Sequence, residues 1–144
     1  MTIANKICNS FKVEILKAVH NFNTSGGDTF NLALYTSSAT LNEDTTVYIT
    51  ANEVATATGY TAKGKALTSV TPVLSGDTAV CDFDNVSWTS ASFTSRGCLI
   101  FNDSAASDQS VCAIDFGGDK TVTSGTFTIE FPAATAGNAI IGIA

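Results

Sequence analysis

Two segments near the end of the chain alternate apolar and polar residues with a period of two. They are residues 111–116 and 126–131, and a Gly-Gly-Asp sequence lies between them at 117–119. A period of two is typical of a strand with one buried and one solvated face. We therefore expect two strands joined around a turn at 117–119. The expected buried residues are Ile114, Phe116, Phe127, Ile129 and Phe131, and the expected solvated residues are Ala113, Asp115, Thr126, Thr128 and Glu130.

Similar short alternating segments, separated by Gly, Ser, Thr and Asp, fill most of the remaining sequence. Roughly seven to nine such strands predict an all-β fold, an antiparallel β-sandwich of the jelly-roll or immunoglobulin-like kind. A chain of 144 residues fits one domain over 1–144. We expect an N-terminal arm at 1–10, one α-helix at 11–20 and strands over 28–144. One strand that begins near Lys65 is expected to end near Pro72, because proline lacks the ladder donor, and Ser75, Gly76 and Asp77 predict a tight turn.

The charges of the chain exclude some partners and indicate others. Charged residues make up 14% of the sequence and the net charge is −6, which argues against a nucleic-acid partner. Three of the seven basic residues, Lys6, Lys12 and Lys17, lie in the first seventeen positions. They are either a solvated helix face or a surface that contacts an acidic partner. No apolar run approaches the ~20 residues that cross a bilayer, and the start of the chain lacks the apolar core of a signal peptide, so we expect no membrane partner and folding in a cytoplasm.

The residues that usually carry catalysis or bind metals are sparse. His20 is the single histidine, and its expected place at the end of the helix favours a structural role. Asp82 and Asp84 alternate along a strand, where a pair of carboxylates is commonplace. We expect no metal site, since the four cysteines form no C-x-x-C motif and there is one histidine. We also expect no enzyme and no cofactor. A disulfide between Cys98 and Cys112 stays open, although a reducing cytoplasm disfavours it.

Three aromatic residues are candidates for a binding surface. Tyr35, Tyr60 and Trp88 could form a platform on which a sugar ring stacks. Alternatively, Trp88 fills the core of the sandwich, and the two tyrosines lie at a subunit interface, where aromatic residues are enriched.

Seven short motifs are spread from residue 11 to residue 132. They are FKxEIL at 11–16, FNLALYT at 30–36, NEV at 52–54, GYTAxGKAL at 59–67, FTxRG at 93–97, DFGxDKTV at 115–122 and FTIxFP at 127–132. Together they resemble a family of small proteins encoded among the structural genes of tailed bacteriophages and prophages. These motifs are strands and turns, so the resemblance identifies a fold family better than a role. It implies a virion protein, and no catalytic residue comes with it.

Within that family, the first hypothesis is a capsid decoration (cement) protein on the outer capsid surface of the virion. Its expected partners are the major capsid protein and itself, as a homo-trimer, since closed symmetry favours a position where capsomers meet. Lys6, Lys12 and Lys17 are the candidate capsid contacts. The alternatives are a tail or baseplate component, and a carbohydrate-binding module that recognises host surface glycans through Tyr35, Tyr60 or Trp88.

Overall fold

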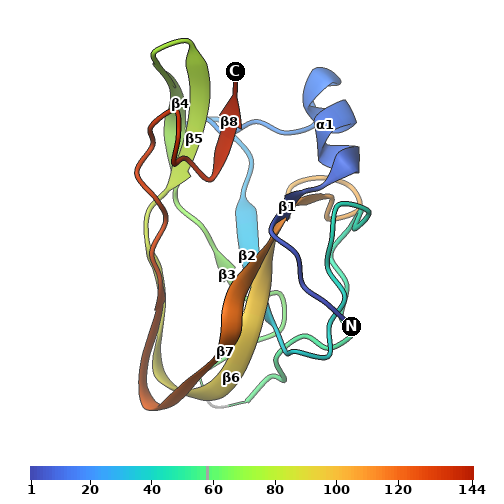
Figure 1. Cartoon of the computed structure of the whole chain (residues 1–144), viewed down its shortest axis with the longest axis vertical. Coiled ribbons are helices and arrows are strands. Elements are labelled where there is room, and N and C mark those ends of the chain that lie inside the picture. Colours follow the sequence, from blue (N-terminus) through green and yellow to red (C-terminus); the bar gives the residue numbers. More distant parts are fainter. Residues whose placement is uncertain (58) are drawn as a thin grey trace.

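The chain folds into two antiparallel β-sheets and one short helix in the computed structural model of Figure 1, which describes residues 1–57 and 59–144. The larger sheet has the strand order β1-β7-β6-β2-β3, and the smaller has the order β4-β5-β8. The expected all-β sandwich with one N-terminal helix is confirmed; residue 58, within the expected strand region, lies outside the described residues. The elements are β1 (Lys6–Ile7), α1 (Asn9–Leu16), β2 (Phe30–Tyr35), β3 (Lys65–Ala66), β4 (Ser69–Ser75), β5 (Thr78–Phe83), β6 (Val86–Asn102), β7 (Ser110–Ile129) and β8 (Ile141–Ile143).

The turn expected at 117–119 is wrong, because these residues lie inside one strand of twenty residues, β7. Both alternating segments pair with β6 instead of with each other. Asp115 pairs with Gly97 and Lys120 pairs with Ser95. Between these two pairs β7 advances by five residues while β6 advances by two. Gly117, at φ +79°, lets the extra residues bulge out of the ladder. The glycines therefore bend a strand rather than reverse the chain.

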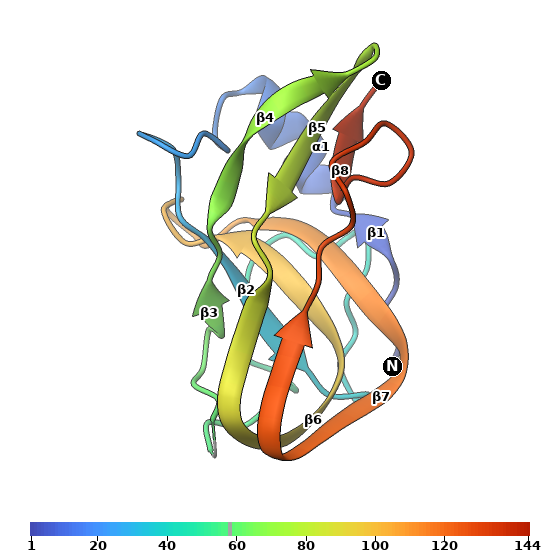
Figure 2. The ribbon, with the colours of Figure 1, turned by 90° about the vertical axis from the view of Figure 1, so that its left-hand side faces the viewer.

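Further bulges curve the β6–β7 hairpin along its length. The pairing also shifts on both sides of Ala91, where Ser90 and Ser124 have positive φ angles. Bulges increase the local bend and twist of a strand pair. Figures 1 and 2 show the result, a hairpin that turns over at the end opposite to α1. One β-hairpin thus contributes to both layers of the sandwich.

The larger sheet is buried on both faces near β2. On one face lies the main core, which includes Phe30, Leu32, Leu34 and Ile100. The other face carries a second apolar cluster under the N-terminal residues and the segment after β2. Its members are Ile3, Ala33, Tyr35, Ala39, Leu41, Leu99, Phe101 and Ala113. Ala113 is therefore buried and not solvated as expected, while Ile114, Phe116, Phe127, Ile129 and Phe131 are partly buried against the main core.

The N-terminus departs from the expected arm at 1–10 and helix at 11–20. Ile3 is buried and bridges to Leu41, and β1 pairs with β7 at Ala113 and Cys112. Strands therefore begin before the helix and not at residue 28. The helix ends at Leu16 because Ala18 adopts a positive φ of 58°, which an α-helix cannot continue. No helix in the described part of the chain has the length and apolarity that a bilayer crossing needs.

The smaller sheet corrects one expectation and confirms another. The strand expected from Lys65 to Pro72 is two strands in different sheets, and β4 continues through Pro72 to Ser75. Pro72 lies at a register shift between Val70 and Val73 on an edge strand, where its missing donor costs least. The turn at Ser75, Gly76 and Asp77 is confirmed, since Ser75 pairs with Thr78 across it.

Candidate functional site

The three aromatic candidates are buried, so they cannot form an exposed platform for a sugar or a partner subunit on this chain. Tyr35, Tyr60 and Trp88 are at most 2% exposed. The Tyr35 hydroxyl donates to the Ile49 carbonyl at 2.6 Å, and the Tyr60 hydroxyl accepts from the Leu34 amide at 2.9 Å. Burial raises the pKa of both hydroxyls. The interpretation of Trp88 as a core residue is correct, and the glycan and interface roles of these three residues are wrong.

Glu53 is the residue that holds Tyr60 and the irregular segment before β3 in place. One of its carboxylate oxygens accepts from the Tyr60 hydroxyl and from the Lys63 amide, each at 2.7 Å. The other oxygen accepts from the Tyr48 hydroxyl at 2.5 Å. A carboxylate with three donors is the expected way to place such a group in a half-buried position. The group is already occupied by structural bonds, so it is not a catalytic candidate.

His20 was expected at the C-terminal end of the helix, but it lies beyond the helix, which ends at Leu16. Its ring is buried beside Phe11, with ring centroids 4.9 Å apart. Nδ1 faces the amide nitrogen of Asn102 at 3.1 Å and Nε2 faces Glu14 at 3.3 Å. Because the amide NH₂ can only donate, Nδ1 accepts and Nε2–H donates. Both ring nitrogens are therefore used within the fold.

The cysteines are free thiols in the core or next to it. Cys98 pairs with Ile114, and Cys112 with Ile100, so the two cysteines are diagonal neighbours rather than opposite each other. Within the described chain none of the four thiols forms a disulfide. Burial raises the pKa of Cys98, and it raises the pKa of Cys112 to about 12 and that of Cys81 to about 11. Such thiols are poor nucleophiles and poor metal ligands at neutral pH.

Metal chemistry finds no site in the part of the chain that the structure describes. There, no three His, Cys, Asp or Glu side chains lie close enough together to hold an ion. Asp82, half of the carboxylate pair considered above, accepts the Phe83 amide at 2.8 Å, and Asp84 is exposed. Two surfaces of the described chain remain as candidate contact sites.

The first of these surfaces is the outer face of α1. Phe11 is buried and Ile15 packs against the core, so the helix turns Val13 and Leu16 outward, 53% and 88% exposed. Lys12 and Lys17 are exposed beside them. We call Lys12, Val13, Leu16 and Lys17 the helix face. The candidate contact Lys6 is also exposed, on β1, where it lies 4.0 Å from Glu43.

Sequence reasoning identified the lysines of the helix face but missed its apolar residues. The signal was present, because Phe11 and Ile15 define the buried stripe and Val13 and Leu16 fall outside it. A helix of eight residues with apolar side chains on both sides predicts a second contact. Because the helix ends at Leu16, and not at residue 20 as expected, the exposed Leu16 lies at its very end.

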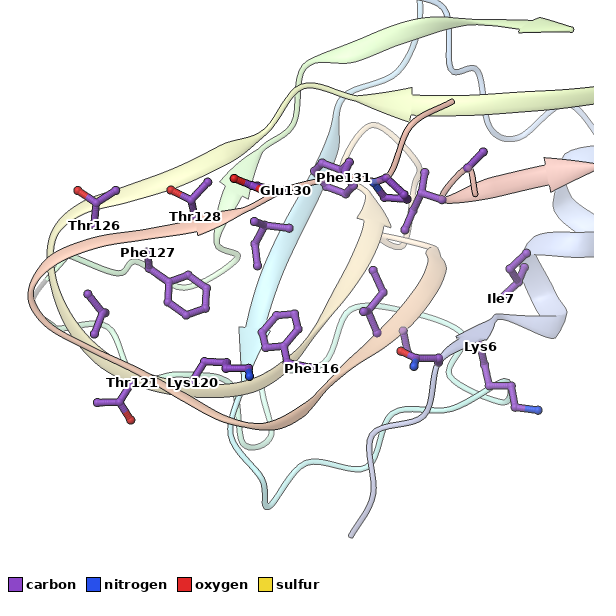
Figure 3. Close-up of a pocket in the computed structure, with 18 residues that line it drawn as sticks. Lys6, Ile7, Phe116, Lys120, Thr121, Thr126, Phe127, Thr128, Glu130 and Phe131 are labelled. Carbon is purple, nitrogen blue, oxygen red and sulfur yellow. The ribbon is translucent and has the colours of Figure 1, made fainter. Parts of the chain in front are cut away.

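The second surface is a concavity inside the curve of β7, which we call the trough (Figure 3). Its volume is about 840 Å³, and it is open to solvent. Apolar side chains cover most of its wall, among them Ile7, Phe116, Phe127, Phe131 and Ile140. Figure 3 shows Phe116 and Phe127 directed into it from the two arms of β7, while Thr126 and Thr128 point away.

The trough was not predictable from the alternating pattern, because it depends on the bulges that fold β7 over. Lys120 belongs to its wall and extends along it towards Phe116 in Figure 3. Among the described residues, Lys120 has no carboxylate within ion-pair distance, whereas Lys63 has two and Arg96 has one. The trough is thus mainly apolar and has two lysines in its lining, Lys120 without a carboxylate partner and Lys6 at 4.0 Å from Glu43.

Comparison of the chain with protein-family models, with curated proteins and with solved structures finds no match in any of the three.

Proposed function

We propose that this chain is a structural protein of a tailed-phage virion, a capsid decoration protein that binds across subunits of the major capsid protein. The observation that carries the proposal is the helix face. Leu16 and Val13 stand exposed on the surface with Lys12 and Lys17 beside them. Contiguous exposed apolar surface marks contact sites for other proteins, and these two side chains are neighbours at i and i+3 on the helix.

The charge of the helix face defines the kind of partner. Lysine stems cover apolar surface while their ammonium groups remain in water, so the face suits an apolar patch that is flanked by carboxylates. The rest of the chain holds the acidic excess that gives the net charge of −6. An acidic body is repelled by packaged DNA and favours the outside of a shell.

Multiplicity explains how a modest contact could stabilise a shell. Few charges need to be dehydrated over the surface of the chain as a whole, since only 14% of its residues are charged. Contacts that are weak singly become effective when many copies bind one particle. The family resemblance of the seven motifs supports the same role.

Binding to expanded, genome-free heads of the phage that encodes the chain tests this proposal. We expect saturable binding in hundreds of copies, and about ten- to hundredfold weaker binding for Leu16→Asp, because burial of a leucine side chain contributes about 1.5–3 kcal/mol. Val70→Asp, at another exposed apolar residue, is the matched control and should bind as the parent does.

Two outcomes contradict the proposal. One is the absence of binding to heads by a folded protein, and the other is equal binding by the Leu16→Asp variant. Recovery of only a few to a few dozen copies per particle, located on the tail, would favour the tail or baseplate alternative.

A further inference from the structure

Besides the helix face the chain has two other apolar surfaces, the end of the β4–β5 hairpin and the trough. We propose that the hairpin end of one copy of the chain binds the trough of another. The end of the β4–β5 hairpin of one copy inserts into the trough of the next copy, and Asp77 of the first faces Lys120 of the second. This contact is a property of the free protein. The contact between copies is a separate claim from capsid binding, so either one can hold if the other fails.

The hairpin end is apolar on both of its faces. Val73 pairs with Val80 and Leu74 with Ala79, so these two consecutive side chains point to opposite sides of the strand. Both are exposed, at 57% and 71%. The row of Leu74 continues through Ala79 to Ile143, which is exposed as well. A hairpin end with two apolar faces buries both only when it enters a concave site.

The trough is concave and apolar and carries the opposite charge. Three phenylalanines, Phe116, Phe127 and Phe131, contribute to its wall, and its volume of about 840 Å³ lies in the range of about 300–1,000 Å³ that is usual for binding pockets. Lys120 provides a cation that no carboxylate of the described chain neutralises. Glu130 also borders the trough, but its carboxylate points away from the cavity in Figure 3.

Charge decides how the hairpin end would enter. Gly76 and Asp77 form the two-residue turn between the paired Ser75 and Thr78, so the Asp77 carboxylate is at the very tip and exposed. Aligned with Lys120 it forms an ion pair at the mouth of an apolar cavity, which fixes the direction of insertion. No positive side chain lies in β4 or β5 to oppose this.

The geometry requires two copies. Figures 1 and 2 show the β4–β5 turn at one end of the molecule and the curve of β7 at the other, so a copy does not fill its own trough. The two surfaces are different patches, which makes the contact heterologous. A heterologous contact that closes on itself generates a ring. Because a two-fold contact is isologous, an oligomer built by this contact holds at least three copies.

The test is the mass of the full chain in solution, without capsids, by light scattering coupled to size exclusion. The parent chain should be an oligomer of three or more copies. Asp77→Lys and Lys120→Glu should each weaken association at least tenfold, and Asp77→Lys combined with Lys120→Asp should restore it. All these side chains are exposed, so circular dichroism should show unchanged folding. Asp119→Lys, the neighbour of Lys120 on β7, is the charge control and should leave the oligomer intact.

Mixing two defective variants tests whether the contact is heterologous. Leu74→Asp blocks only the hairpin end and Lys120→Glu only the trough, so an equimolar mixture keeps one intact contact and should form a one-to-one dimer. A parent chain that is monomeric at millimolar concentration overturns the proposal. So does an oligomer that ignores both substitutions, a mixture that forms no dimer, or a double charge reversal that does not restore association.

Discussion

Alkaline pH should unfold this protein through its tyrosines, because the fold holds all three hydroxyls in the neutral form. Burial, together with the bond to Glu53, raises the pKa of Tyr48 to about 12. Burial also raises the pKa of Tyr35 and of Tyr60. The perturbation is a rise in pH from 9 to 12 in the presence of a reducing agent, which keeps the four cysteines as thiols.

The sign and size of the effect follow from the difference between the two states. In the unfolded chain the tyrosines ionise near the usual pKa of 10.0, whereas in the folded chain the pKa of Tyr48 is raised to about 12. The unfolded state therefore binds fewer protons in this window, and stability falls as the pH rises. The two buried hydroxyls, of Tyr35 and Tyr60, give a loss of about 3 kcal/mol per pH unit above pH 10, since one pKa unit corresponds to about 1.4 kcal/mol. The partly exposed Tyr48 adds less, because solvent screens it. The buried thiols, including Cys112 with its pKa raised to about 12, begin the loss from pH 9.

A domain of this size has a total stability of about 5–15 kcal/mol, so the protein should unfold before pH 12. The assay follows tyrosinate absorbance and circular dichroism in the same titration. We expect a single steep transition in which tyrosine ionisation and loss of structure coincide. Glu53→Gln, which removes the carboxylate beside Tyr48 and Tyr60, should allow Tyr48 to ionise at lower pH. Ionisation of one or more tyrosines near pH 10 with an unchanged dichroism spectrum would refute the reasoning.

Three further predictions concern stability and reactivity. Glu53→Ala should lower the free energy of unfolding in urea by about 3 kcal/mol or more, because it leaves several donors unpaired at about 1–3 kcal/mol each, while Glu53→Gln should cost about 1 kcal/mol; equal values would contradict the role of the carboxylate. Gly64→Ala should prevent stable folding, since φ is +68° and a Cβ would lie 1.8 Å from the Leu32 carbonyl oxygen, whereas Gly26→Ala, at φ +74° with open space, should cost only about 1–2 kcal/mol by thermal melting. Cys8, Cys98 and Cys112 should react with a thiol reagent at neutral pH only as fast as the chain unfolds, and rapid labelling of any of them in the native state would show that its burial is wrong.

Local patterns predicted those parts of the fold that local interactions determine. The turn at 75–77 and the burial of Trp88 follow from turn chemistry and from the single tryptophan of a sandwich. The sequence at 117–119 has the same turn chemistry, yet it forms a bulge. Only the partner strand distinguishes the two outcomes, because β6 is long enough to pair with both sides of Gly117. That partner lies outside any short window of sequence.

The tyrosines are buried by segments that have no helical or strand periodicity in the sequence. Tyr35 lies on the face of β2 that alternation leaves for solvent, and it is buried because Ile3, Ala39 and Leu41 pack over that face. Glu53 fixes the neighbouring segment through side-chain bonds rather than through a helix or strand. An aromatic pattern alone therefore could not separate a binding platform from a second core. The trough depends in the same way on bulges that are visible only in three dimensions.

An electron cryomicroscopy map of the intact phage particle tests the central claim most directly, because the claim is about location and contact. The account predicts density for this chain on the outer surface of the capsid, with the hairpin end of one copy in the trough of the next and with Val13 and Leu16 of the helix face against the major capsid protein. Density for the chain at the tail alone, no density on the particle, or a capsid-bound chain whose helix face points to solvent would contradict it.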